Sequence, residues 1–271
     1  MSFSGFETSI SDGMPFELYE FTYGFTVYRF CTIPERVTIG TAIYDPLPIS
    51  RGGIQLTEQN NKAQVSIYAP ADFIVANPFK TSVPSQAIFV TIKKKHYNEP
   101  EVIVEWTGRV MTAKWADAGV EMVCESTYSA LSQNVNKRHY SFSCPHVLYG
   151  EECRANQSLH KLVTTVTVSG LTLTSENFGI KPNGFYTGGT VTYQDDNYLL
   201  HTRFIFSHTG NNIVLTQQLP YLPANAQVTV YPGCDHTLET CKDKFDNVVN
   251  FGGFPWIPGK NPFTTASSIY F

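Results

Sequence analysis

Alternation of apolar and polar residues with a period of two is the feature that most constrains how this chain can fold. In the N-terminal half it runs through FELYEFTYG, FTVYRFCTI, RVTIGTAIYDP, AQVSIYAP, AIFVTIKKK and EVIVEWTGRVMTAKWADAGVEMVCEST, which Pro, Gly or Asn separate. The pattern returns in KLVTTVTVSGLTLT, GGTVTYQDDNYLLHTRFIFSH, NNIVLTQQLP and AQVTVYPG. Because successive side chains of a strand point to opposite faces, these stretches predict a meander of short strands. The expected fold class is therefore mainly β.

The alternation is interrupted near Ser126, and this interruption divides the chain. STYSALSQNVNKRHY lacks the period of two and begins with a possible N-cap, so a short helix or a connecting segment is expected at about 126–140. With 271 residues, the chain is long enough for two domains of ordinary size. We expect a β domain at residues 1–135 and a second domain at residues 136–271, with a small β module inserted at about 160–232.

The surface expected for this chain is poor in charge. Charged residues make up 15% of the sequence, aromatic residues 14%, and the net charge is −4. Such a composition is typical of a subunit of a permanent assembly, although an ordinary β protein with a well-packed core is an equal alternative. The dense basic run, Lys93–Lys95, closes a strand pattern, and we interpret it as a guard against edge pairing. Nucleic acid is not expected to be the primary partner.

The N-terminal sequence predicts where the chain folds. MSFSGFETSISDGMPF has neither a basic n-region nor an apolar h-region, and no stretch of the chain approaches the roughly 18 apolar residues of a membrane span. No membrane insertion is expected, and folding is expected in a cytoplasm, where thiols are kept reduced. The six cysteines therefore favour metal binding or burial over a disulfide framework.

The cysteines fall into two groups. Cys31 and Cys124 lie in strand patterns and are expected to be buried in the core, because a free cysteine behaves as a small hydrophobic residue. The others lie in the turn-rich segments SCPHVLYGEEC and GCDHTLETC: Cys144, Cys153, Cys234 and Cys241. Loops can direct several side chains to one point, which a metal site requires. These residues are the predicted metal ligands.

The spacing alone leaves the metal open. The two pairs read C-x8-C and C-x6-C, which is wider than common zinc knuckles and unlike the standard ferredoxin motifs. Four thiolates suit Zn²⁺ or an iron–sulfur cluster, and disulfides or simple burial remain alternatives. His146 and His236 each follow a cysteine by two residues and could replace a thiolate.

An aromatic, proline-rich segment follows the last cysteine. Its bulky residues are Phe245, Phe251, Phe254, Pro255, Trp256 and Pro258. One hypothesis is that this segment folds over the metal site and excludes water and oxygen. Packing against the β module or against a neighbouring subunit is the alternative.

Sequence motifs for catalysis are missing. The chain has no G-x-S-x-G, H-E-x-x-H or G-x-x-x-x-G-K-[ST] motif. Cys144 and His146 could resemble a peptidase pair, but no third residue that would orient them is identifiable. We therefore do not expect an enzyme.

Several longer stretches resemble the conserved tail proteins of long-tailed phages and prophages. In the N-terminal half these are FETSISDGMPFELYEFTYG, AIYDPLPISRGGI and VSIYAP. In the C-terminal half they are RHYSFSCPHVLYGEECRA and VTVYPGCDHTLETCKDKFDNVVNFGGFPWIPG. The resemblance covers nearly the whole chain, and the cysteine arrangement is similar to that of the minor tail protein L of phage lambda and of the hub protein of gene transfer agents.

The resemblance implies a subunit of the tail tip or baseplate hub, assembled in the host cytoplasm and located in the virion. It implies a [4Fe–4S] cluster on Cys144, Cys153, Cys234 and Cys241, and an N-terminal half of small hub-like β-barrels that form a ring, often as a trimer. The implied neighbours are the distal tail protein ring and the central fibre or receptor-binding tail proteins. An iron–sulfur electron-transfer or redox-sensing protein and a zinc-stapled β-rich adhesion protein are the alternatives.

The cluster would join two segments that are far apart in the chain. Between Cys153 and Cys234 lie 80 residues. If the loop-closure model for disulfides is borrowed, closing this loop is worth about 4 kcal/mol of chain entropy. A structural role for the cluster is therefore expected.

Overall fold

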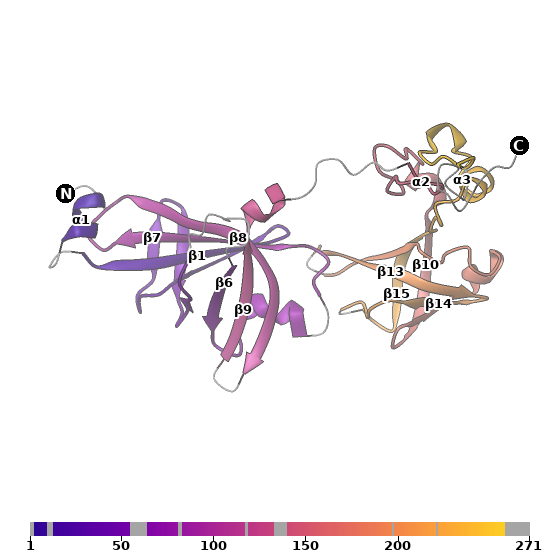
Figure 1. Ribbon diagram of the computed structural model, residues 1–271. Coiled ribbons are helices and arrows are strands. Elements are labelled where there is room, and N and C mark those ends of the chain that lie inside the picture. Colours follow the sequence, from indigo (N-terminus) through magenta and orange to yellow (C-terminus); the bar gives the residue numbers. More distant parts are fainter. Residues whose placement is uncertain are drawn as a thin grey trace, which may run out of the picture. The chain divides into compact units, whose positions relative to one another are not determined.

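The structure is a computed structural model that describes residues 3–9, 13–54, 64–80, 83–116, 119–132, 140–196, 198–220 and 222–257. It consists of two compact units, Met1–Asn134 and Val135–Phe271 (Figure 1). Strands form most of the regular structure in both units, so the prediction of a mainly β fold is confirmed. Among the described residues, no helix has the length and apolar character needed to cross a membrane.

The first unit is built on a nine-stranded sheet with the order β3-β4-β2-β1-β7-β8-β9-β6-β5. Its strands are β1 (Pro15–Tyr23), β2 (Thr26–Cys31), β3 (Val37–Ile39), β4 (Ala42–Pro46), β5 (Ser50–Arg51), β6 (Gln64–Ala69), β7 (Ile88–His96), β8 (Val102–Ala116) and β9 (Gly119–Ser126). Neighbouring strands are antiparallel except β2 and β4. The helices are α1 (Phe3–Thr8), η2 (Ile74–Lys80) and η3 (Thr127–Ser132).

Strand β1 is buried on both faces. On one face, Leu18 packs in a cluster with Cys31 and Tyr44. On the other face, Phe21 contacts Phe73 at a ring-centroid distance of 5.5 Å. The predicted burial of Cys31 is confirmed, and Cys124 is likewise fully buried, in β9.

The interpretation of the basic run as an edge guard is wrong. Lys93 and Lys94 lie in β7, which is an inner strand between β1 and β8. Lys93 forms an ion pair with Glu20 at 2.9 Å, and Lys94 forms one with Glu7 at 2.6 Å. Consecutive lysines in a sheet point to opposite faces, and in this sheet each face supplies a carboxylate partner.

Side chains, rather than strand pairing, bring distant strands of this sheet together. Arg51 of the end strand β5 forms ion pairs with Glu17 of β1 at 2.8 Å and with Glu105 of β8 at 2.5 Å. The sheet is therefore curled so that β5 approaches strands that are not its neighbours. The resemblance implies small β-barrels for this half, and the structure shows one nine-stranded sheet that the ion pairs of Arg51 draw together. Alternation alone indicates which face a residue occupies and not whether the first and last strands pair.

We predict that Arg51→Met destabilises the first unit by about 2 kcal/mol. The change leaves two partly buried carboxylates without their shared cation, although their residual solvation keeps the loss below the value for a fully buried pair. Urea unfolding would measure the change. Arg36→Met is the matched control, because Arg36 and Asp45 form an exposed pair that is expected to contribute less than about 1 kcal/mol. Equal effects of the two substitutions would contradict the closing role of Arg51.

The second unit contains a closed six-stranded barrel with the order β10-β11-β14-β13-β12-β15. Its strands are β10 (Leu162–Ser169), β11 (Thr172–Thr174), β12 (Thr190–Gln194), β13 (Leu200–Thr209), β14 (Asn212–Leu215) and β15 (Asn225–Tyr231), and η4 (Glu176–Ile180) follows β11. The first strand pairs with the last, with Leu162 opposite Val230. The two ends of the barrel segment therefore leave the barrel side by side.

The cysteine-bearing segments flank the barrel in the sequence. They contain three short helices, α2 (Gln157–His160), α3 (Leu238–Asp243) and η5 (Val248–Asn250). Of the region 126–140, for which a short helix or a connection is predicted, residues 127–132 form η3, and residues 133–139 lie outside the described part of the chain.

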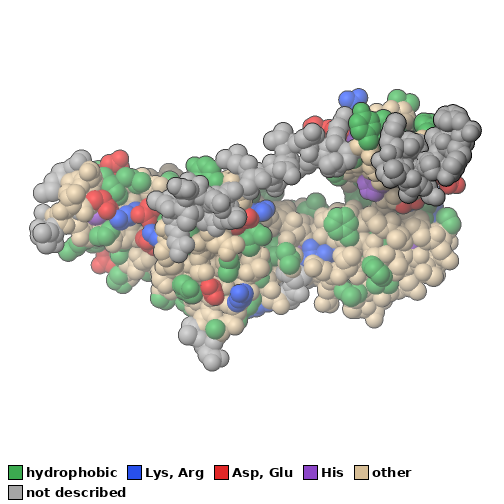
Figure 2. All heavy atoms as spheres, in the orientation of Figure 1, with side chains coloured by type: hydrophobic (Ala, Val, Ile, Leu, Met, Phe, Trp, Pro, Cys, Tyr) green, Lys and Arg blue, Asp and Glu red, His purple; other side chains and the backbone are tan. Residues whose placement is uncertain are grey.

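Large hydrophobic side chains are exposed on the second unit. Phe204 and Phe206 lie on the outward face of β13 and are 63% and 70% exposed. Figure 2 shows hydrophobic side chains scattered over this unit, with few charged groups between them. This surface agrees with the low content of charged residues in the sequence.

Candidate metal centre

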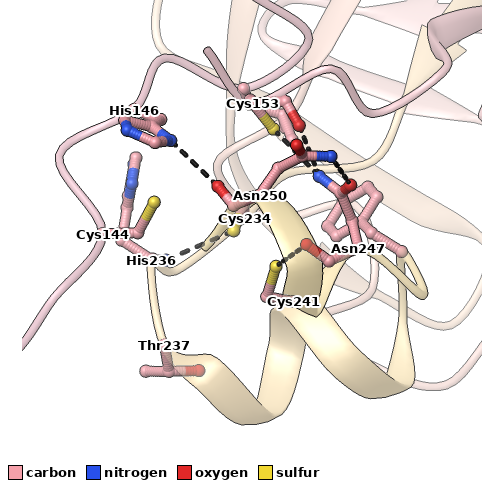
Figure 3. A pocket seen from close by; sticks show the side chains of 11 residues that line it. Cys144, His146, Cys153, Cys234, His236, Thr237, Cys241, Asn247 and Asn250 are labelled. Carbon is pink, nitrogen blue, oxygen red and sulfur yellow. Dashed lines mark hydrogen bonds between the residues drawn. The ribbon is translucent and has the colours of Figure 1, made fainter. Parts of the chain in front are cut away.

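The four predicted ligands line one pocket. Cys144 and Cys153 come from the segment before α2, Cys234 lies three residues after the end of β15, and Cys241 lies in α3 (Figure 3). A main-chain hydrogen bond of 2.9 Å, from Cys144 N to His236 O, joins the two segments. The fold thus brings together thiols that are up to 97 residues apart in the sequence (241 − 144 = 97).

The donor set is that of a soft metal. Four thiols around one pocket suit an iron–sulfur cluster or Zn²⁺. Among the described residues, no three His, Cys, Asp or Glu side chains form a group that could hold one metal ion. A tetrahedral zinc site would require thiolates about 3.8 Å apart, whereas each thiolate of a four-iron cluster binds a different iron atom and does not have to meet the others.

Three of the sulfur atoms accept hydrogen bonds from nitrogen. His236 N donates to Cys234 Sγ at 3.3 Å, and Gly252 N donates to Cys144 Sγ at 3.4 Å. The Asn247 side-chain amide lies 3.6 Å from Cys153 Sγ. Donors of this kind stabilise thiolate ligands and influence the reduction potential of iron–sulfur clusters.

Backbone strain is concentrated around the pocket. Five described residues other than glycine have positive φ, and four of them lie in the cysteine-bearing segments: Tyr149 at 63°, Arg154 at 55°, His236 at 63° and Asp246 at 47°. A left-handed conformation costs these residues about 1–2 kcal/mol each, so it persists only where surrounding contacts enforce it. At His236 the left-handed conformation allows two hydrogen bonds to cysteines. Its N–H donates to Cys234 Sγ, and its carbonyl oxygen accepts from Cys144 N.

Burial disfavours ionisation of the thiols in the absence of a cation. Burial raises the pKa of Cys241 to about 11, and the other three cysteines act in the same direction. Burial also raises the pKa of Cys234. These two groups are therefore thiols at neutral pH unless a bound cation compensates the negative charge.

A half-buried lysine joins this site to the barrel. Lys244 Nζ donates to the main-chain oxygens of Gly233, at 2.6 Å, and of Phe185. It also lies over the rings of Phe185 and Phe245, at 4.5 and 5.5 Å from their centroids. Burial lowers the pKa of Lys244, whereas the nearby Cys234 raises it. Lys244 thus provides a positive charge close to the thiols.

Both candidate histidines line the pocket, and each also has a structural role. His146 Nδ1 donates to the carbonyl oxygen of Asn250 at 3.0 Å, and His236 positions two cysteines through its main chain. The His146 ring also explains Gly252, because a Cβ at this position would lie 2.4 Å from His146 Nε2. A glycine is needed where the backbone donates to Cys144.

The aromatic segment covers the site only in part. Phe245 lines the pocket and is buried, as the covering hypothesis predicts. Trp256 is 87% exposed and does not line the pocket. Just before it, Phe254 N donates to Ser141 O at 2.8 Å. Pro258 lies outside the described residues. The covering role therefore falls to Phe245 and not to Trp256.

Sequence reasoning missed Lys244, Asn247, Asn250 and Gly252. The last three belong to NVVNFGG, which reads as turn-forming material. Its position within the aromatic segment that follows the last cysteine was the available signal, but the pattern does not show which asparagine faces a sulfur.

The comparisons with known proteins place the chain near phage proteins. Residues 184–261 match the family described as "Phage conserved hypothetical protein BR0599". A relative from Xylella fastidiosa (strain 9a5c), described as "Uncharacterized protein", is 28% identical over 182 residues. That alignment covers 61% of this chain and 38% of the relative, so the chain spans well under half of the relative's length.

A solved structure has the same fold. It is a chain in a structure described as "Virion of native gene transfer agent (GTA) particle", and it matches with a TM-score of 0.77 over 96% of this chain and 93% of that chain. The sequence identity is 19%, so this likeness concerns the fold.

Proposed function

We propose that the chain is a structural protein of a phage virion, a minor tail protein in the tail tip or baseplate hub ring. We further propose that Cys144, Cys153, Cys234 and Cys241 hold a [4Fe–4S] cluster that stabilises the second unit. The observation that carries this proposal is that four thiols from two distant segments line one pocket, in a fold shared with a chain of a virion particle.

The surface supports a role in assembly. Phe204, Phe206 and Trp256 are each more than 60% exposed, and permanent interfaces are rich in such residues. The partners proposed are further copies of the chain, as a trimer, the distal tail protein ring, and the central fibre or receptor-binding proteins. The proposal includes no catalytic activity, and it places the protein at the virion tail tip.

The thiols and the N–H groups of the site both favour a cluster. The four cysteines would bind the four iron atoms, and the N–H groups of His236, Gly252 and Asn247 would stabilise the thiolates. When bound, the cluster would supply strong bonds between the two segments and, in principle, one-electron chemistry. Zn²⁺ is the alternative metal.

The proposal is tested by purification of the full chain without air. We expect a broad absorption shoulder near about 400 nm that bleaches in oxygen, with about four iron and four sulfide per chain. A colourless protein that contains one zinc would refute the cluster and leave the virion role in place.

Electron microscopy of phage particles with labelled protein would test the tail-tip position, and label along the head or tail tube would refute it.

A further inference from the structure

We infer that Asn247 is the residue that positions the cysteine site, because it holds one cysteine of each segment in place and directs an N–H donor at the Cys153 sulfur. This inference rests on the metal-binding role proposed above and deepens it.

The main chain of Asn247 is bound to Cys241. Asn247 N donates to Cys241 O at 3.0 Å, a main-chain hydrogen bond that remains when Cys241 binds metal as a thiolate. In the thiol form, Cys241 also donates to Asn247 O at 3.3 Å. Asp246, the preceding residue, takes a left-handed conformation with φ of 47°, which turns the chain back toward α3. The backbone at Asn247 is therefore fixed relative to the C-terminal pair of cysteines.

The side chain of Asn247 is bound to Cys153. Its Nδ2 lies 2.5 Å from Cys153 O and 3.6 Å from Cys153 Sγ, 94 residues away in the sequence (Figure 3). One residue thus connects the segment of Cys153 with the segment of Cys241, and it does so next to the sulfur atoms.

The orientation of this amide is determined by its neighbour. Asn250 Nδ2 donates to Asn247 Oδ1 at 2.7 Å, so the other end of the Asn247 amide, the donor, must face Cys153. The main-chain carbonyl oxygen of Asn250 accepts a hydrogen bond from His146 Nδ1, which ties Asn250 to the segment of Cys144. Asn250 and His146 therefore support Asn247 in one of its two possible orientations.

Only an amide meets these requirements. An aspartate at position 247 has the same shape and could still accept from Asn250, but it would present a carboxylate oxygen to the carbonyl and sulfur of Cys153. Residues that hold metal ligands in place typically change metal affinity by about 10–100-fold when they are substituted. We therefore expect the identity of residue 247 to control how firmly the metal is held.

The experiment compares the metal-loaded full chain with Asn247→Asp under argon. We expect the variant to release metal to a chelator at least about ten-fold faster. For a cluster, we also expect faster bleaching in air and a more negative reduction potential, which loss of packing alone would not produce. Release, bleaching and potential equal to those of the wild type would overturn the inference.

Two further variants sharpen the comparison. Asn156→Asp introduces the same charge at the N-cap of α2, where aspartate is an equally good cap, and should behave as the wild type. Asn250→Asp leaves Asn247 intact but favours the reversed amide, so it should also accelerate metal release, and a wild-type rate would contradict the orientation argument. If Asn247→Asp does not fold, the rate of metal release from Asn250→Asp tests the inference instead. A wild-type protein without any metal would refute the proposed function itself, whereas unchanged variants of a metal-loaded protein refute only this inference.

Discussion

Substitution of Cys144 by alanine is expected to abolish stable metal binding and to loosen the cysteine-bearing segments. Cys144 accepts a hydrogen bond from Gly252 N, its main chain joins the two segments, and its sulfur is one of the four that line the pocket. A hundred-fold loss of affinity would lower the stability of the second unit by about 2.7 kcal/mol when the metal is saturating. Metal content per chain and the unfolding midpoint are the measurements.

Cys124→Ala is the matched control for this prediction. Cys124 is fully buried in β9 of the first unit. The residues that line the pocket all belong to the second unit. Its loss should weaken the first unit through a small cavity and leave the metal content unchanged. A Cys144→Ala protein with full metal content, or a Cys124→Ala protein without metal, would contradict the assignment of the ligands.

Gly233→Ala is expected to destabilise the second unit by a similar amount, through a steric clash and not through loss of a ligand. A Cβ at this position would lie 2.1 Å from Thr187 O, 2.3 Å from Gly188 C and 2.4 Å from Gly189 N. All three are main-chain atoms of the segment directly before β12, so the contact is relieved only by a shift of the backbone. We expect a loss of about 3 kcal/mol in the free energy of unfolding of the second unit.

The same substitution should also lower metal affinity, because Cys234 follows Gly233 directly. Chemical unfolding together with metal analysis tests both effects. Gly53→Ala is the control, since no atom lies within 4 Å of its Cβ position, and a change within about 0.5 kcal/mol is expected. If Gly233→Ala were as mild as Gly53→Ala, the close approach of this segment to the barrel would not matter for stability.

Parts of the fold could be read from the sequence because they depend on local pattern. Alternation predicts strands wherever one face is buried, and Cys31 and Cys124 follow from it directly. Closure and strand order depend on contacts between distant residues. The pairing of Leu162 with Val230 and the ion pairs of Arg51 are of this kind, and no local pattern contains them.

The candidate site shows the same division. The gathering of the cysteines around one pocket could be predicted from their positions in turn-rich segments and from the resemblance to tail proteins. The residues that support them could not. Asn247 is distinguished from Asn250 only by the direction of its amide in space. Composition likewise does not reveal that Trp256 is exposed and lies away from the pocket lining.

Because the two ends of the barrel segment are adjacent, the stability that a metal could add by closing the loop is smaller than the sequence predicts. The sequence predicts that a cofactor closes a loop of 80 residues, with a gain of about 4 kcal/mol. In the structure, pairing of β10 with β15 already closes this loop between Leu162 and Val230. The part of the gain that belongs to the cofactor is therefore smaller, because it closes only the short stretches that lead from the barrel to Cys153 and Cys234.

This pairing also allows a particular order of events during maturation, if the cysteines hold the proposed cofactor. If the barrel folds first, the pairing of β10 with β15 brings the chain ends that carry Cys153 and Cys234 close together. The proposed cofactor could then be inserted late, into a pocket that is already formed. In a cell that must build many particles, metal delivery would then be separated in time from chain folding, and a folded chain could wait for its metal.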